Sequence, residues 1–143
     1  MYLTDAPIYL GRFFDYSPGT SCGALSFFVG IVRDEDHRKR VKKLSYECYP
    51  SMAEKTMAEL AGEAQCRWPV GQVRVLHRIG DLAIGDVAVV VAVASKHRDD
   101  AFLACRFMIE GIKTKVPIWK KQFFEDGTAE WVVCGHSHEH ALS

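Results

Sequence analysis

The sequence lacks the features that mark membrane and exported proteins. Its longest uninterrupted apolar run is Val87–Ala94, with eight residues, whereas a helix that spans a bilayer needs roughly 20. The N-terminal stretch Met1–Gly11 has neither a basic start nor a long apolar core, so we expect no signal peptide. We therefore expect a cytoplasmic protein without a membrane partner.

The cysteine pattern argues against a disulfide framework. The five cysteines make an odd number and form no Cys-x-x-Cys pair: Cys22, Cys48, Cys66, Cys105 and Cys134. Such a scattered set is typical of a reduced compartment. The tail histidines His136, His138 and His140 have no cysteine partners at ligand spacing, so we expect neither a metal site nor a cofactor. His77 lies on the apolar face of a predicted strand, and we interpret it as a core histidine.

The sequence also has no excess of either charge. Eighteen lysine and arginine residues balance eighteen aspartate and glutamate residues, whereas domains that coat nucleic acid usually carry a basic excess. Glycine-rich phosphate loops, the Gly-x-Ser-x-Gly elbow and the His-Glu-x-x-His motif are also absent from it. We therefore expect no nucleic-acid partner, and a local basic site remains possible.

What the sequence does contain is a regular succession of strand and helix patterns. Apolar periodicity predicts six main strands: Cys22–Arg33, Val41–Tyr49, Val70–Ile79, Val87–Ser95, Ile118–Phe124 and Glu130–Cys134. Ser51 and Glu54 match a capping box, which predicts a helix that runs to about Cys66. Asp99 and Asp100 suit the first turn of a second helix, because acidic side chains there complement the helix dipole.

Two segments between the strands are predicted to be connections. Asp34–Lys43 is a run of charges without a period, which is typical of a mobile surface loop. Leu82–Gly85 links two strands, and residues 135–143 form a tail without an apolar pattern. Since no repeat or linker interrupts the pattern, we expect one α+β domain over residues 1–143, with two main helices on a largely antiparallel sheet.

We expect the functional site around Gly111–Gln122. This stretch holds four lysines within nine positions: Lys113, Lys115, Lys120 and Lys121. Pro117 removes a backbone donor and favours an extended residue before it, so the chain should leave the helix and return Lys120 from another direction. Two interpretations stay open here, namely four lysines on solvated faces, or two lysines that converge on an anion.

A second basic group stands where the buried strand becomes a helix. Unpaired backbone amides and the positive end of the helix dipole favour a bound anion there, and His97 and Arg98 could grip a phosphate. Asp99 and Asp100 could instead compensate the charge of these two residues. Arg33 ends an apolar strand and is placed to project from a rigid element into a crevice.

Taken together, these residues resemble the large, catalytic subunit of molybdopterin synthase. The matching pieces follow the family's order from about residue 22 to Trp131: Gly23-Ala24, Phe28-Val-Gly-Ile-Val-Arg33, Leu44-Ser-Tyr-Glu-Cys-Tyr49, Met52-Ala53, His77-Arg-Ile-Gly80, Leu82, Ile84-Gly85, His97-Arg-Asp-Asp-Ala-Phe102, Lys113 and Pro117-Ile-Trp-Lys-Lys121. The His-Arg…Ala-Phe and Lys…Pro-Ile-Trp-Lys pair is the specific signal. The resemblance implies an α/β-hammerhead fold, which is consistent with the α+β order.

The resemblance implies a sulfurtransferase. The family converts cyclic pyranopterin monophosphate (precursor Z) to molybdopterin by installing two dithiolene sulfurs. The sulfur arrives as a thiocarboxylate on the C-terminal Gly-Gly of a small ubiquitin-like subunit, whose tail inserts into a pocket of the large subunit. Large subunits of the family form a homodimer with a small subunit at each end, which gives a heterotetramer.

By position, the resemblance assigns catalysis to Lys113 and Lys120. It assigns substrate binding to the same two lysines and to seven further residues: Ile31, Val32, Arg33, His97, Arg98, Lys121 and Gln122. Our hypothesis is that Lys113 is the acid/base or covalent group and that Lys120 stabilises the developing oxyanion and the carrier's terminal carboxylate. The sequence departs from the family at Asp34–Arg40, which lacks the usual asparagine and glycine, and at Gln122, where glutamate is common.

Two competing interpretations remain. The chain could be a non-catalytic α+β module that binds a phosphorylated ligand or RNA through its lysine cleft. It could also be a family member that has lost activity and acts as a scaffold, although the retained Lys113 and Lys120 argue against this. A stable complex with a small Gly-Gly-tailed protein, together with consumption of precursor Z, would distinguish the enzyme from both.

Overall fold

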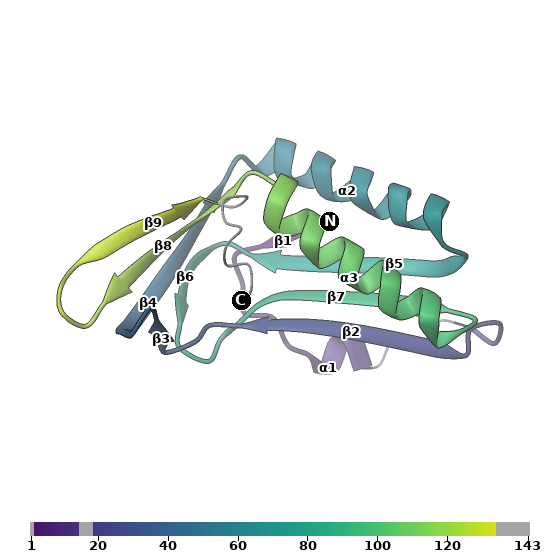
Figure 1. The fold of residues 1–143 in the computed structure, drawn as a ribbon, viewed down its shortest axis with the longest axis horizontal. Coiled ribbons are helices and arrows are strands. Elements are labelled where there is room, and N and C mark those ends of the chain that lie inside the picture. Colours follow the sequence, from purple (N-terminus) through teal and green to yellow (C-terminus); the bar gives the residue numbers. More distant parts are fainter. Residues whose placement is uncertain (1, 15–18, 134–143) are drawn as a thin grey trace.

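The computed structural model describes residues 2–14 and 19–133, which form two sheets and the helices packed on them (Figure 1). The elements are β1 (Leu3–Thr4), α1 (Gly11–Phe14), β2 (Ala24–Ile31), β3 (Glu35–Asp36), β4 (Lys39–Cys48), α2 (Pro50–Arg67), β5 (Val70–Arg78), β6 (Gly80–Ala83), β7 (Val87–Ser95), α3 (Arg98–Lys115), β8 (Ile118–Phe124) and β9 (Ala129–Val133). The expected α+β class with two main helices is confirmed.

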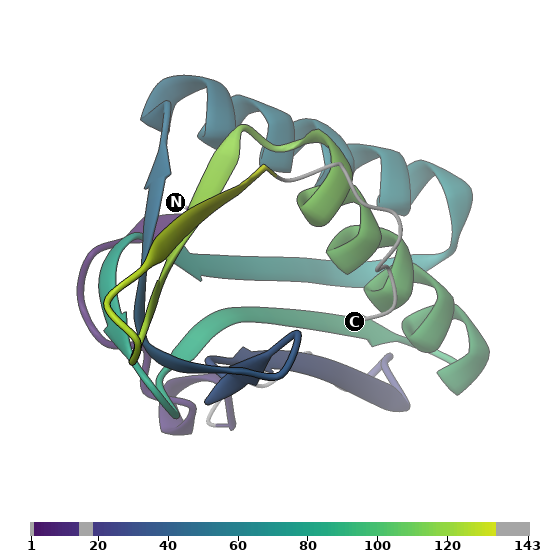
Figure 2. The same ribbon diagram turned by 60° about the vertical axis from the view of Figure 1, so that its left-hand side comes forward.

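The two sheets are almost entirely antiparallel. The larger one has the order β1-β5-β7-β2, and only its edge strand β1 runs parallel to its neighbour. The second has the order β3-β4-β8-β9, and β6 also pairs with β4. Helices α2 and α3 lie side by side over one face of the larger sheet, while β4, β8 and β9 extend from one end of it (Figures 1 and 2).

Strand β7 is covered on both faces, as its continuous apolar run predicted. Val89, Val91 and Val93 belong to the core under helices α2 and α3. Val90 and Ala92 face the other way and pack with residues of the N-terminal segment and α1. Burial of a valine side chain contributes about 1.5–3 kcal/mol, so the five buried valine and alanine side chains named here stabilise the sheet from both of its faces.

Helix α3 approaches helix α2 closely at Gly111. A Cβ atom built on this residue would lie 2.7 Å from Cδ2 of Leu60 on α2, so a larger residue here would force the Leu60 side chain to shift. Glycine thus lets Leu60 pack directly against the backbone of α3, close to the last turn that carries Lys113.

The capping box predicted at the start of α2 is wrong. The helix begins at Pro50 with Tyr49 as N-cap, and no side chain caps it. The Glu54 carboxylate instead accepts hydrogen bonds from the backbone N–H groups of Tyr2, at 3.0 and 3.1 Å, and Leu3, at 3.1 Å. Glu54 thus fastens strand β1 to helix α2, a contact between positions more than fifty residues apart that local pattern could not reveal.

Two predicted connections contain strands instead. Within Asp34–Lys43, strands β3 and β4 form a hairpin whose turn residues His37 and Arg38 have φ values of 51° and 68°. These left-handed values favour asparagine and glycine, the residue types missing from this loop. Likewise, Leu82 is paired with Leu44 and belongs to strand β6 rather than to a connector.

His77 is buried in the core, as expected, with 6% of its surface exposed. Its Nδ1 lies 2.8 Å from the carbonyl oxygen of Arg78, and its ring meets that of Tyr46 edge to face at 4.9 Å. Because a carbonyl only accepts hydrogen bonds, Nδ1 carries the proton. Burial, and next the charge of Lys113, lower the pKa of His77 to about 4 despite the Arg78 hydrogen bond.

Some expectations lie outside the described residues. The histidines at 136, 138 and 140 and the predicted tail 135–143 belong to this part of the chain. Across residues 2–14 and 19–133, no helix has both the length and the apolar character that crossing a membrane requires.

We predict that Glu54→Ala lowers the free energy of unfolding by about 2 kcal/mol, because hydrogen bonds to a charged acceptor are lost. Ser51→Ala is the matched control and should change it by less than about 0.5 kcal/mol, since Ser51 caps nothing. Urea denaturation followed by circular dichroism measures both values. A larger loss in Ser51→Ala than in Glu54→Ala would restore the capping box.

We also predict that the protein loses stability as the pH falls from 6.5 to about 4, the ordinary and the folded-state pKa of His77. In this window the unfolded chain binds a proton that the folded chain does not, so unfolding becomes easier by up to about 3 kcal/mol. His77→Phe cannot titrate, and its unfolding free energy should fall by that much less over the same interval. Identical pH dependence in both proteins would contradict the assignment.

Candidate active site

Lys113 and Lys120 approach one corner of the molecule from two elements. Lys113 lies in the last turn of α3, and Val116 leaves the helix with an extended backbone (φ −81°, ψ 131°). Pro117 follows, and strand β8 then carries Lys120. The predicted turn of the chain between the two lysines is therefore present.

The half-buried Tyr46 and the buried His77 form an aromatic pair to which each lysine can be related. Tyr46 on β4 is directly opposite Lys120 in the β4–β8 register, so their side chains share one face of the sheet. The ring of Tyr46 contacts the ring of His77, and the charge of Lys113 acts on that same imidazole. Tyr46 also packs against the cluster that contains Ile112 and Val116 at the end of α3. Strand pairing therefore places Lys120 beside Tyr46, and the end of α3 that carries Lys113 lies on the same side of the molecule.

The three polar residues of β8 do not share one face. Alternation along a strand places Lys120 and Gln122 on one side and Lys121 on the other. The Nζ atom of Lys121 lies over the rings of Phe123, at 5.1 Å, and Trp131, at 5.3 Å. The side chain of Lys121 therefore lies on the opposite face of the strand from the side chain of Lys120, so the three residues do not all face one pocket.

Gln122 is buried on the Lys120 side of the strand. Only 3% of its surface is exposed, and among the described residues its Oε1 atom has no hydrogen-bond partner. A buried carbonyl oxygen without a partner is costly, so this atom is available to a group that donates a hydrogen bond.

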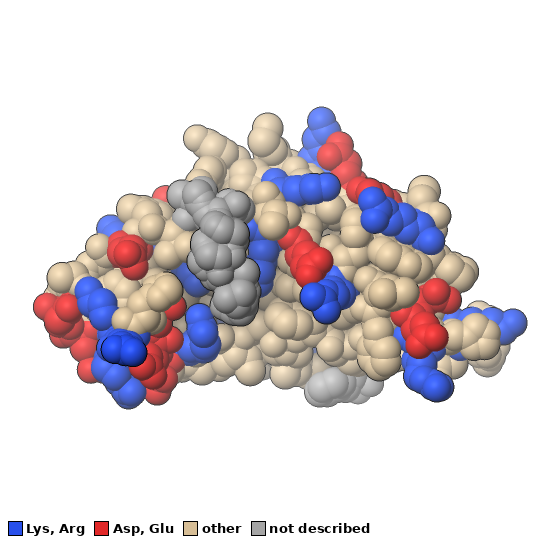
Figure 3. All heavy atoms as spheres, viewed as in Figure 1, with Lys and Arg blue, Asp and Glu red and all other residues tan. Residues whose placement is uncertain are grey.

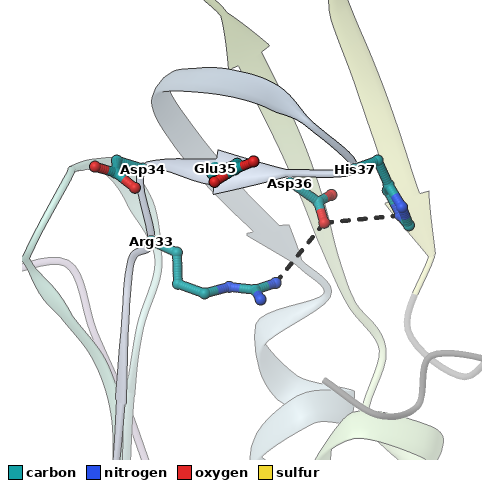
Figure 4. A pocket seen from close by; sticks show the side chains of 5 residues that line it. All are labelled: Arg33, Asp34, Glu35, Asp36 and His37. Atoms are coloured by element: carbon teal, nitrogen blue, oxygen red, sulfur yellow. Dashed lines mark ion pairs between the residues drawn. The ribbon is translucent and has the colours of Figure 1, made fainter.

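Arg33 stands just beyond the end of β2 at the edge of a hollow of about 460 Å³, lined by Arg33, Asp34, Glu35, Asp36 and His37. Figure 4 shows its guanidinium reaching toward Asp36, and the two groups are 3.8 Å apart. The guanidinium side chain is 61% exposed, so this ion pair is weak and an anionic ligand can replace the carboxylate.

Val32, the residue before Arg33, is anchored by both of its backbone groups. Val32 is buried, its N–H donates to the carbonyl of Asp86 at 3.0 Å, and its carbonyl accepts from the N–H of Gly85 at 2.9 Å. Both backbone groups of Val32 are therefore occupied, which limits the contribution expected from it as a backbone ligand. Ile31, in contrast, is exposed.

His97 and Arg98 lie far from the lysine corner within one chain. His97 is the N-cap of α3 and Lys113 is in its last turn. Arg98 and Lys113 are fifteen positions apart, and at about 1.5 Å per residue this separates them by about 22 Å along the helix. Arg33 is at the lysine end, because β2 pairs antiparallel with β7 and ends beside Val87. The structure does not bring all the predicted site residues together.

The charges around the site are balanced locally. Lys43 pairs with Asp81 at 3.7 Å, and Arg78 with Asp86 at 3.1 Å. Figure 3 shows basic and acidic side chains interspersed over the face that it presents. On such a surface, an anion is attracted by a few individual cations and not by an extended region of positive charge. This distribution of charge disfavours nonspecific binding of nucleic acid.

Sequence reasoning gave no functional role to Tyr46 or His77. Both stand on the inward faces of predicted strands, and the alternation of β4 and β5 could have identified these faces. Their contact with each other joins β4 to β5, however, and only the packing of the two sheets reveals it.

Comparison with known proteins supports one family. The family model described as "MoaE protein" matches residues 3–115; Lys120, Lys121 and Gln122 follow this range. The molybdopterin synthase catalytic subunit of Halalkalibacterium halodurans is 47% identical over 130 residues, which cover 91% of this chain and 83% of that protein.

Solved structures agree with this match. The crystal structure of molybdopterin synthase from Staphylococcus aureus superposes with a TM-score of 0.85 at 39% identity, covering 92% of this chain and 95% of that one. A subunit 1–subunit 2 complex of the molybdopterin-converting factor from Helicobacter pylori contains a chain that aligns with a TM-score of 0.74 at 22% identity, covering 94% and 90%; this second likeness concerns the fold alone. From these matches, the chain belongs to the MoaE family of molybdopterin synthase catalytic subunits.

Proposed function

We propose that this chain is the catalytic subunit of a molybdopterin synthase. It acts as a sulfurtransferase that converts precursor Z to molybdopterin, with sulfur from the C-terminal Gly-Gly thiocarboxylate of a small ubiquitin-like subunit. The observation that carries this proposal is the convergence of Lys113 and Lys120 on the Tyr46–His77 corner. The free state of the described cysteines, Cys22, Cys48, Cys66 and Cys105, supports a cytoplasmic location.

The two lysines suit the two demands of sulfur transfer. The thiocarboxylate sulfur forms a bond to a carbon of precursor Z, and a carbon–oxygen bond at that carbon breaks, so that the oxygen leaves as water or with the phosphate. Water then cleaves the bond between the sulfur and the carrier's acyl carbon, which leaves the sulfur on the substrate as a thiol and releases the carrier as a carboxylate. Lys113 serves as the acid/base or covalent group in these steps. Lys120 stabilises the oxyanion at the acyl carbon and the carboxylate with which the carrier leaves.

The substrate's phosphate requires further cations. Arg33 lies at the same end of the larger sheet as Lys113. Among the described residues its guanidinium pairs with Asp36 and stays 61% exposed. His97 and Arg98 are about 22 Å away along α3, too far to contact the same small molecule. We propose that the protein forms a homodimer in which His97 and Arg98 of the second copy complete the site of the first.

We predict that Lys113→Ala lowers the rate of molybdopterin formation by about 10²–10⁴-fold, the usual range for loss of an acid/base group. Lys120→Ala should lower it by about 10²–10³-fold through loss of oxyanion stabilisation. Lys115→Ala is the matched control on the same helix and should retain nearly full activity. The assay combines each variant with thiocarboxylated small subunit and precursor Z. Full activity of Lys113→Ala would refute its role.

We further predict that a mixture of Lys113→Ala and Arg98→Ala subunits regains activity that neither variant has alone. If Arg98 acts across the dimer, each mixed dimer contains one intact site, and random exchange gives roughly a quarter of the wild-type rate. If Arg98 acts within its own chain, no mixed dimer has an intact site. Failure to regain activity, after native mass spectrometry has verified subunit exchange, would contradict the shared site.

A further inference from the structure

An ion pair between Arg78 and Asp86 has no part in the proposed chemistry. The Nη1 group of Arg78, on β5, donates to Oδ2 of Asp86 at 3.1 Å, and the Nη2 group donates to the carbonyl of Asp81 at 3.3 Å. Only 14% of the Arg78 side chain is exposed. Because Arg78 is largely shielded from water, separating the pair would leave this charge without a partner, which keeps the pair closed.

Asp86 belongs to a tight turn between β6 and β7. Its backbone N–H donates to the carbonyl of Ala83 at 3.1 Å, and its Oδ2 atom accepts from the N–H of Ala83 at 2.9 Å. Gly85, the third residue of this turn, has a φ of 88°, a left-handed value that favours glycine. The carboxylate that Arg78 binds therefore also closes the turn.

The β6–β7 turn anchors Val32, the residue before Arg33. The Val32 N–H donates to the carbonyl of Asp86 at 3.0 Å, and the Val32 carbonyl accepts from the N–H of Gly85 at 2.9 Å. The pairing of β2 with β7 is irregular at its last step, and β2 ends at Ile31. Since the regular ladder stops there, the two hydrogen bonds to the turn hold the backbone of Val32.

The direction of the Arg33 side chain depends on this anchor. Its guanidinium is 61% exposed, and its ion pair with Asp36, at 3.8 Å, is weak (Figure 4). On the other side, the carbonyl of Asp34 accepts from the N–H of Val41 at 2.9 Å. Arg33 thus stands between two anchored residues. Because the backbone sets the direction of the Cα–Cβ bond, a shift of Val32 would aim the guanidinium elsewhere.

We propose that Arg78 and Asp86 are positioning residues for the sulfur-transfer reaction: through the β6–β7 turn and Val32, their ion pair fixes the backbone from which Arg33 reaches the phosphate of precursor Z. Arg78 itself stays bound to Asp86 and makes no contact with the substrate. The inference rests on the proposed role of Arg33 in binding this phosphate.

The first readout is the kinetics of the enzyme reconstituted with thiocarboxylated small subunit and precursor Z. Arg78→Met removes the hydrogen-bond donors and keeps an unbranched side chain. It is expected to raise KM for precursor Z by about fivefold to tenfold and to keep kcat within about twofold, because a phosphate contact acts alike in the ground state and the transition state. An unchanged KM overturns the proposal.

Arg74→Met is the matched control. Arg74 lies four positions earlier on the same face of β5, and its guanidinium lies over the ring of Phe13 at 4.8 Å. Both substitutions remove an arginine from this face, but only Arg78 binds the turn. Arg74→Met should leave KM and kcat within about twofold of wild type, and a rise in KM equal to that of Arg78→Met overturns the proposal.

A double-mutant cycle with Arg33→Ala separates positioning from a merely structural role. Arg33→Ala removes a charge-assisted hydrogen bond and should raise KM by about 10–100-fold. If Arg78 acts through Arg33, adding Arg78→Met to Arg33→Ala should change KM by less than about twofold, because no guanidinium remains to be aimed. A double variant whose KM rises by the product of the two single effects overturns the proposal.

The second readout needs no activity. Hydrogen exchange of the large subunit alone, followed by NMR, measures the amides of Val32 and Gly85, which form the two hydrogen bonds between β2 and the turn. The amide of Val91, in the buried core of β7, serves as the reference for global unfolding. Arg78→Met is expected to accelerate exchange at Val32 and Gly85 at least about fivefold more than at Val91. Equal acceleration at all three amides, or none, overturns the proposal.

These measurements distinguish the inference from the proposed function. If Arg33→Ala leaves KM unchanged, the role of Arg33 is wrong and the inference is overturned with it. If Arg33→Ala raises KM and Arg78→Met does not, the inference alone is overturned. If Arg78→Met does not fold, Asp86→Asn replaces it, since its amide oxygen can still accept from Ala83 while the charge that binds Arg78 is lost. This variant should raise KM by about threefold, and an unchanged KM overturns the proposal.

Discussion

Burial of strand β7 on both faces is the constraint on which the rest of the structure depends. Its valines pack under α2 and α3 on one side and against the N-terminal segment on the other. Because α3 begins just after β7 ends, it must run back along the strand, which brings its last turn to the end of the sheet where β2 finishes. Lys113 and Arg33 are thereby placed at one end and His97 and Arg98 at the other.

Most of the fold could be predicted from the sequence because its long elements have strong periodicity. The strands corresponding to β2, β4, β5, β7, β8 and β9 and both main helices follow local patterns. Strand β6 has only four residues and is stabilised by pairing with β4, so no local pattern marks it. At Glu54 the local pattern is misleading. The sequence matches a capping box, but the carboxylate accepts hydrogen bonds from backbone N–H groups of the distant N-terminal segment.

Part of the candidate site could also be predicted from local features of the sequence. Pro117 fixes where the chain leaves α3, so the approach of Lys113 and Lys120 follows from the sequence. The separation of Lys121 from Lys120 also follows from strand alternation, whereas the family resemblance assigned both residues to substrate binding. His77 could be recognised as a buried histidine, but its relation to Lys113 depends on α3 crossing over β5, which no spacing in the sequence specifies.

Separation of the cations along α3 has a physical advantage for an enzyme that binds a phosphate. Two lysines, two arginines and a histidine gathered in one empty pocket would repel one another and lower the stability of the folded chain. Here Arg33 pairs with Asp36 while His97 and Arg98 remain at the far end of the helix. In the proposed dimer these groups meet only across the interface, where the substrate's phosphate can offset their repulsion.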